Sequence, residues 1–225
     1  MLASDYAQLD AQLPGGGWPV GALTELLLPH PGVGELRLLA PVLAAVQALQ
    51  RCVMWFDPPA TPCAWALLAL GIDVRRLVLV TPRVEMKPPG PGRVAGKPPA
   101  ADMLWALEQA LKSGHLGAVL AWLPPRLPAD ALRRLQLAAQ AHEGPVFLLR
   151  SEQERARASA APLRLLLGSA GPDQLQVTLL KRRGPPLATA LTLALAPVLS
   201  PPALARALQA AAALPLHAAA GGPSW

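Results

Sequence analysis

The sequence predicts an α/β fold, with a mainly parallel sheet flanked by helices and an antiparallel hairpin near the carboxyl end. Short apolar runs alternate with helical patterns over the first 150 residues, which is typical of strands joined by crossover helices. These runs are apolar throughout rather than alternating, as in strands covered on both faces. Later in the chain, two runs are separated by only a short connection, which favours antiparallel pairing.

The amino-terminal part begins with a short helix or arm, Ser4 to Pro14, and a glycine-rich turn around Trp18. We expect this tryptophan to pack in the core, because the glycines beside it let the backbone come close. Pro41 should kink the helix that begins at Glu35, or delay its regular part, because proline has no N–H for the helical hydrogen bond. The predicted strands here are Thr24–Leu28, Val53–Phe56, Leu77–Val80, Ala118–Leu123 and Val146–Arg150. Helices are predicted at Glu35–Leu49, Asp102–Lys112 and Ala129–Ala141. A further helix should begin after its cap residue Thr61 and end at Gly71.

The pattern changes after residue 160. Leu163–Leu167 and Gln174–Lys181 predict two strands of a hairpin, joined by the six residues from Gly168 to Asp173. A further strand is predicted at Leu191–Leu195. The sheet should therefore end in antiparallel strands on one side.

Two segments outside these elements are rich in loop-forming or small residues. Residues 83–100 contain many prolines, glycines and lysines and predict a long loop, and residues 203–214 predict a terminal helix before a disordered tail. We divide the chain into an arm (residues 1–22), a main domain (23–196) and a terminal segment (197–225).

Composition allows one domain with a well-filled core. Of the 225 residues, 52% are hydrophobic and 15% charged, so the chain can bury enough apolar surface to fold. No apolar run is long enough to cross a bilayer and the start lacks a signal-peptide pattern, so we expect a cytoplasmic protein without membrane contact. The two cysteines and four scattered histidines form no cluster, so no metal is expected.

The stretch Thr24–Leu36 has the context of a phosphate-binding P-loop: a strand, a Pro/Gly turn with Gly32 and Gly34, then a helix start. A working P-loop needs a lysine after its last glycine and then a Ser or Thr hydroxyl. Glu35 and Leu36 stand there instead. A carboxylate would repel a polyphosphate by about 4 kcal/mol at roughly 4 Å and an effective dielectric near 20, although it also suits a helix amino terminus. We therefore expect no nucleotide cofactor.

Positive charge is concentrated near the carboxyl end. The chain carries a net charge of +6, and residues 151–225 contain seven lysines and arginines against three carboxylates. The run Lys181-Arg182-Arg183 could contact DNA phosphates or an acidic partner, or could simply keep a strand end free of edge pairing. Trp122 at a strand end could anchor an interface, whereas core packing is expected for most of the tryptophans, which include Trp55, Trp65 and Trp105.

An ordered set of motifs resembles one protein family. The motifs are GGGWPVG (15–21), TELLL with PGVGELRLLAP (24–28 and 31–41), LWALEQAL (104–111), GAVLAWL (117–123), LRRLQLA (132–138) and VTLLKRRG (177–184). Together they resemble ImuA, a RecA-like accessory protein of translesion DNA synthesis, and they span about residues 9–184. GAVLAWL also resembles SulA, a related cell-division inhibitor.

The resemblance to ImuA implies a RecA-like fold that has lost catalysis. The position of a magnesium-holding aspartate falls at Ala121 or Trp122, and that of a catalytic glutamate falls near Pro58 or Pro59, beside Asp57. Asp57 suits a turn better than a catalytic base. The chain is therefore expected not to be an enzyme.

The expected function is accessory. The chain would act in the SOS damage response, scaffolding an ImuB-type polymerase-like protein and, indirectly, an error-prone DnaE-type polymerase. The alternatives are a SulA-like inhibitor that binds the tubulin-like division protein and a DNA-binding RecA paralogue. Direct DNA contact and self-association are left open.

Overall fold

The structure is a computed structural model. It describes residues 1–81, 100–128, 130–184, 190–198 and 202. The chain divides into a compact unit, Met1–Leu195, and a second unit, Ala196–Trp225. Two predictions, most of the loop at 83–100 and the helix and tail from 203 onward, lie outside the described residues. Everything that follows concerns the first unit.

One eight-stranded sheet runs through this unit, in the order β3-β2-β4-β5-β1-β6-β7-β8. Strands β1 to β6 pair in parallel, and β6-β7 and β7-β8 are antiparallel. The predicted α/β class, with a mainly parallel sheet and an antiparallel hairpin, is confirmed. The strands are β1 Leu23–Leu28, β2 Cys52–Phe56, β3 Leu77–Val80, β4 Leu116–Trp122, β5 Val146–Ser151, β6 Leu163–Gly171, β7 Gln174–Lys181 and β8 Leu191–Ala194.

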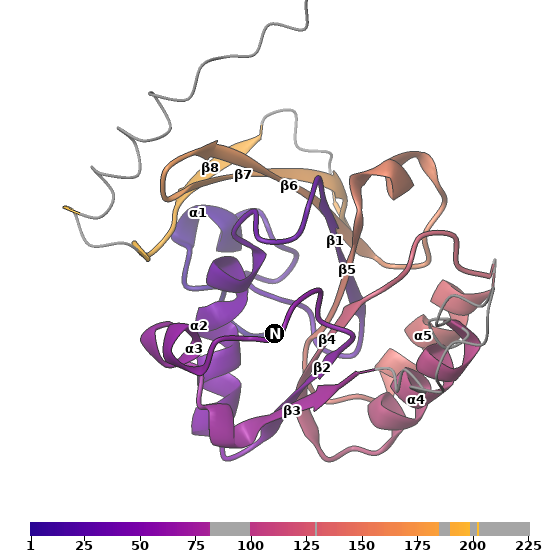
Figure 1. Ribbon diagram of the computed structural model, residues 1–225. Coiled ribbons are helices and arrows are strands. Elements are labelled where there is room, and N and C mark those ends of the chain that lie inside the picture. Colours follow the sequence, from indigo (N-terminus) through magenta and orange to yellow (C-terminus); the bar gives the residue numbers. More distant parts are fainter. Residues whose placement is uncertain (82–99, 129, 185–189, 199–201, 203–225) are drawn as a thin grey trace, which may run out of the picture. The chain divides into compact units, whose positions relative to one another are not determined.

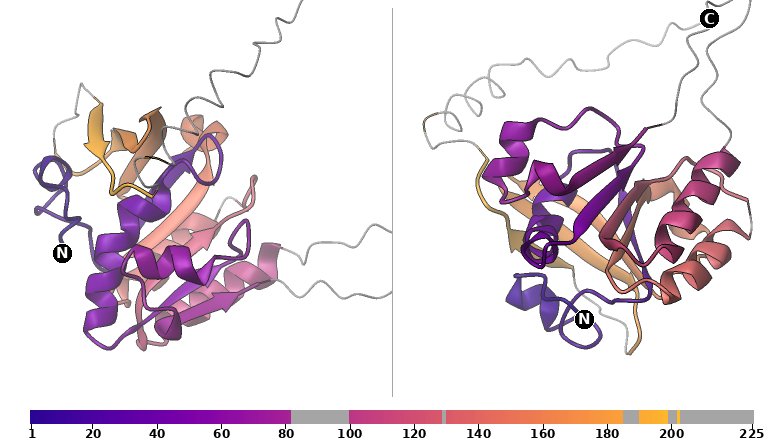
Figure 2. Two further views of the ribbon diagram at one scale, coloured as in Figure 1. Left: turned by 60° about the vertical axis from the view of Figure 1, so that its left-hand side comes forward. Right: turned by 90° about the horizontal axis from the view of Figure 1, so that it is seen from below.

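Helices cover both faces of the sheet, as Figures 1 and 2 show. The helices are α1 Ala7–Asp10, α2 Glu35–Ala48, α3 Ala64–Ala69, α4 Ala100–Lys112 and α5 Ala131–Gln140, with short 3-10 turns η1 Val74–Arg76 and η2 Glu152–Ala156. One core lies between the sheet and α1–α2 and contains Trp18, Trp55 and Phe147. The other lies under α4 and α5. β1, β4 and β5 are buried along nearly their whole length, which explains why most of their residues are apolar.

Pro41 does not divide α2, which runs unbroken from Glu35 to Ala48. Proline leaves the carbonyl of Arg37, four residues earlier, without its helical donor. The hydroxyl of Tyr6 donates a hydrogen bond to that carbonyl at 3.2 Å. The amino-terminal segment therefore compensates for the proline. The regular helix begins at Glu35, so its predicted later start was wrong, and a kink at Pro41 stays a prediction.

Two local predictions need correction. Cys63, not Thr61, occupies the cap position of α3. The connection of the β6–β7 hairpin is shorter than predicted, because β6 continues to Gly171 and leaves only Pro172 and Asp173 between the strands. Asp173 adopts a φ of 53° there. Its carboxylate forms an ion pair with Arg37 of α2, and the distance between the nitrogen and the oxygen is 2.5 Å.

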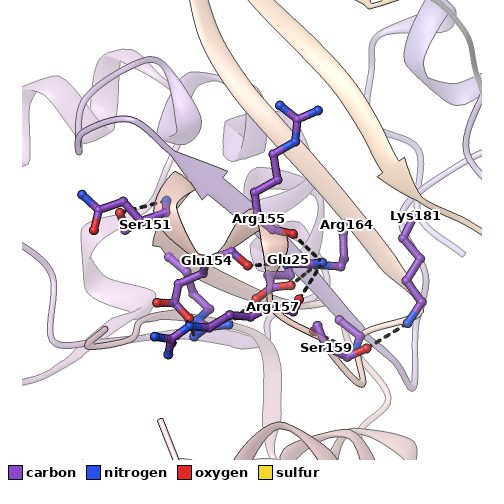
Figure 3. Close-up of polar contacts among 11 residues, drawn as sticks. Glu25, Ser151, Glu154, Arg155, Arg157, Ser159, Arg164 and Lys181 are labelled. Atoms are coloured by element: carbon purple, nitrogen blue, oxygen red, sulfur yellow. Dashed lines mark hydrogen bonds and ion pairs between the residues drawn. The ribbon is translucent and has the colours of Figure 1, made fainter. Parts of the chain in front are cut away.

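A buried network of charges joins β5, β1 and β6 (Figure 3). Glu25 of β1 is fully buried. One of its oxygens accepts from Arg150 of β5 at 2.7 Å, and the other accepts from Nε of Arg164 of β6. Arg150 also pairs with Glu154 at 2.7 Å, and Arg164 donates to the carbonyl of Glu154 at 3.0 Å. Two carboxylates thus balance two guanidinium groups inside the protein.

We expect Glu25→Gln to destabilise the protein by roughly 3–5 kcal/mol, because it leaves buried guanidinium charge without compensation. The measurement is the urea-unfolding free energy. The matched control is Glu108→Gln, which removes a 2.8 Å pair to the half-exposed Arg134 and should cost at most about 1 kcal/mol. Equal losses in the two variants would contradict the assigned role of the buried network.

His142 is the other buried ionisable side chain of note. It is 2% exposed, and neither ring nitrogen has a hydrogen-bond partner within the described structure. Burial, helped by the positive charge of Arg51 and opposed by Glu143, lowers the pKa of His142 to about 4. The folded protein therefore holds this histidine in its neutral form.

Acid should destabilise the protein through His142. The unfolded chain takes up the proton near its ordinary pKa of about 6.5, so stability should fall as the pH drops from about 6.5 to about 4. In His142→Leu this part of the pH dependence should disappear, whereas His115→Leu, at an exposed site, should keep it. Parallel stability–pH curves for wild type and His142→Leu would refute the expectation.

Candidate functional site

The candidate site is the loop of residues 29–34, which joins the carboxyl end of β1 to the start of α2. Gly32 and Gly34 have φ values of 86° and 124°, a region that side chains disfavour. A Cβ on Gly34 would also lie 2.8 Å from Leu195 and 3.3 Å from Leu175. The shape of the loop therefore depends on its glycines, and the antiparallel side of the sheet packs against it.

Glu35 fills this loop with its own carboxylate. Its side chain accepts hydrogen bonds from the backbone N–H of Gly32 at 2.8 Å and of Gly34 at 3.1 Å, and the residue is 3% exposed. Backbone amides at a helix amino terminus are the groups that bind phosphate. The sequence predicted a helix-terminal acid at Glu35, but it did not predict that the side chain turns back onto the loop.

The other expected catalytic positions are also occupied by apolar groups. Leu36 packs at the edge of the core, and Ala121 is fully buried. Trp122 is 8% exposed and packs edge-on against Trp55, with ring centroids 5.6 Å apart. An indole therefore stands where a metal-holding aspartate would be expected, and the suggestion that Trp122 is an exposed anchor does not fit its burial.

Asp57 directly follows β2 and has the geometry of a turn residue. Its φ is 49°, and its N–H donates to the carbonyl of Val80 at 2.8 Å. This matches the turn role favoured by the sequence. In the parts of the chain that the structure describes, no three His, Cys, Asp or Glu side chains are placed to hold a metal ion, and no helix is long and apolar enough to span a bilayer.

The predicted cationic run lies at the end of β7, and two of its side chains contact the protein itself. Lys181 donates to the carbonyl of Ser159 at 2.9 Å, and Arg182 donates to the carbonyl of Gln12 at 2.5 Å. Arg183 is exposed. Contact of this run with DNA or with an acidic partner stays a prediction.

An exposed apolar surface lies on α3 and β3. We call it the α3–β3 surface and define it by Trp65, Leu68 and Leu79, which are 82%, 49% and 42% exposed. Val78, which is 39% exposed, neighbours Leu79 in β3 and therefore points to the other face of the sheet. β3 is the edge strand of the sheet. Trp65 was expected in the core. Because nearly every residue of α3 is apolar, the spacing gave no indication of which side would face solvent.

A shallow polar depression of about 500 Å³ lies next to this surface, between the end of α2 and η1. Arg75 and Arg76 line it. Hydrogen bonds from Arg75 hold the pKa of Asp73 below its usual value, so Asp73 stays charged and offsets part of the positive charge. The depression thus places two guanidinium groups beside exposed apolar side chains.

No protein-family model matches the chain. It is 35% identical over 125 residues to the cell division inhibitor SulA of Edwardsiella piscicida, covering 56% of this chain and 64% of that protein. It is 24% identical over 134 residues to the cell division inhibitor SulA of Serratia marcescens, covering 60% of this chain and 70% of that protein. The chain therefore spans a little under two thirds of the length of the first of these relatives.

We expect Glu35→Ala to cost roughly 1–3 kcal/mol, because buried amides lose their acceptor. Sulfate should recover part of that loss by binding to the freed amides, while leaving wild type unchanged beyond its general salt effect. Glu152→Ala, which removes an exposed acid from the first position of η2, is the matched control. Thermal unfolding with and without sulfate measures the effect, and equal sulfate responses in all three proteins would exclude an anion role for the loop.

Proposed function

We propose that this chain is a non-catalytic accessory protein of error-prone translesion synthesis in the SOS damage response. In this proposal it binds an ImuB-type polymerase-like protein and, through it, an error-prone DnaE-type polymerase. The ordered motifs that resemble ImuA support this assignment. The chain would act by holding other proteins together rather than by hydrolysing a nucleotide.

The nucleotide loop supports the non-catalytic part of the proposal. Glu35 already occupies the amides of Gly32 and Gly34, so a phosphate would have to displace a charged group of the protein. An ATPase also needs a lysine and then a Ser or Thr hydroxyl after the last glycine of its P-loop. Glu35 and Leu36 stand at these two positions instead. Magnesium-dependent ATP turnover by the purified protein would contradict this part.

The α3–β3 surface carries the protein-binding part of the proposal. Trp65 is 82% exposed, and an exposed tryptophan among apolar neighbours is the commonest kind of binding anchor. Arg75 and Arg76 belong to η1, which connects α3 to β3, and charged residues beside exposed apolar ones are typical of the rim of a protein interface. A partner with an apolar segment flanked by acidic residues would fit.

A second candidate function is inhibition of cell division, through binding of the tubulin-like division protein. The identity of 35% to a SulA protein favours it. The KRRG ending of β7 and the longer carboxy-terminal region favour the ImuA-like function instead. Both functions need a protein-binding surface, so the same experiment can separate them.

The experiment is a pull-down in which the purified full chain is offered the ImuB-type protein and the division protein in separate reactions. We expect capture of the ImuB-type protein. Trp65→Ala should weaken that capture at least tenfold, since such anchors contribute about 2 kcal/mol or more.

Trp105→Ala is the matched control, because Trp105 is also exposed, at 62%, but lies on α4 over the opposite face of the sheet. It should leave capture unchanged. Capture of the division protein alone would replace the first function by the second. Equal loss in the two variants would show that the α3–β3 surface is not the specific anchor.

A further inference from the structure

We propose that Arg157, Lys181 and Arg183 form a site for the sugar–phosphate backbone of nucleic acid, at the start of β6 and the end of β7. This site is separate from the α3–β3 surface and does not depend on the protein-binding function. It would bring the accessory protein onto DNA without reading its sequence.

The fold brings these cations together from two segments. Lys181 lies opposite Arg164 in the antiparallel register of β6 and β7, and its ammonium group reaches the carbonyl of Ser159 (Figure 3). Arg164 also donates to the carbonyl of Arg157 at 3.2 Å, which holds that segment against the strand end. Arg183 follows Lys181 by two residues.

Their charge is not neutralised by the buried network beneath them. Glu25 and Glu154 are already balanced by Arg150 and Arg164. The side chain of Arg157 is 52% exposed, and its guanidinium group lies 3.5 Å from a carboxylate oxygen of Glu154. Arg150 pairs with the same oxygen at the shorter distance of 2.7 Å.

The other two cations have no carboxylate partner. Lys181 bonds to a carbonyl rather than to a carboxylate, and Arg183 makes no ion pair within the described structure. The hydrogen bond of Lys181 and the ion pair of Arg157 leave a net positive charge at this end of the two strands, and such a surface attracts anions.

The surroundings favour nucleic acid over a protein partner. Protein interfaces have an apolar centre with aromatic anchors, but none of the exposed large apolar side chains in the described structure belongs to β6, β7 or residues 152–162. Guanidinium groups match phosphate oxygens through paired hydrogen bonds. Without stacking aromatics or groups that reach base edges, the contact would be independent of sequence.

The test is fluorescence anisotropy of the full chain with a labelled 30-residue single strand and with the matching duplex, over a series of KCl concentrations. In Arg157→Gln/Lys181→Gln/Arg183→Gln, binding should weaken roughly tenfold or more, and the slope of log affinity against log salt should become shallower by about 2, which corresponds to three lost phosphate contacts. The control Lys112→Gln/Arg126→Gln/Arg133→Gln removes the same net charge from other exposed positions and should keep most of the affinity.

A second measurement uses the wild-type protein and so does not depend on how the variants fold. Bound DNA should protect Lys181 from acetylation but not Lys112, which is exposed at the end of α4. Equal weakening in the two triple variants, equal acetylation of Lys181 with and without DNA, or tighter binding to vesicles of anionic lipid than to DNA would each overturn the proposal.

Discussion

The buried carboxylate of Glu25 connects the two halves of the sheet. It lies on β1 and receives one arginine from the parallel strand β5 and another from β6, where the antiparallel strands begin. Ionised side chains inside a protein are tolerated only when they are paired and hydrogen-bonded. These three strands must therefore keep one relative register, and that register also sets where the loop after β1 and the end of β7 lie.

A second carboxylate, that of Glu35, stabilises the loop between β1 and α2. The loop amides need an acceptor, and the first residue of α2 supplies one from within the chain. Leu175 and Leu195 from the antiparallel side pack against Gly34. The shape of the loop is thus supported by side chains of the protein itself.

The helices α2 and α3 differ in how much of their surface they bury. A helix that is largely buried supports the core, whereas an exposed apolar side of a helix can contact another molecule. α2 buries eight of its residues, whereas α3 buries only Leu67 and leaves Trp65 in solvent. Both are rich in apolar residues, so hydrophobicity alone does not distinguish a core helix from a binding helix. Both helices pack on the same core. α2 lies against the strands β2 and β4, whereas α3 contacts mainly η1, and this position leaves most of α3 uncovered.

The sequence by itself determined the order and type of the elements. Continuous apolar runs and their spacing placed β1 to β5, β7 and β8 within a few residues, because burial on both faces leaves a local signal. The absence of a P-loop lysine and hydroxyl could also be predicted from the sequence, since it depends only on which residues follow Gly34.

Only the tertiary structure decided the contacts between distant residues. These are the Tyr6 bond that lets Pro41 remain within α2, the outward position of Trp65, and the pairing of Glu25 with Arg150 and Arg164, residues that are 125 and 139 positions away. Such contacts arise from packing and register across the sheet, which no local pattern records.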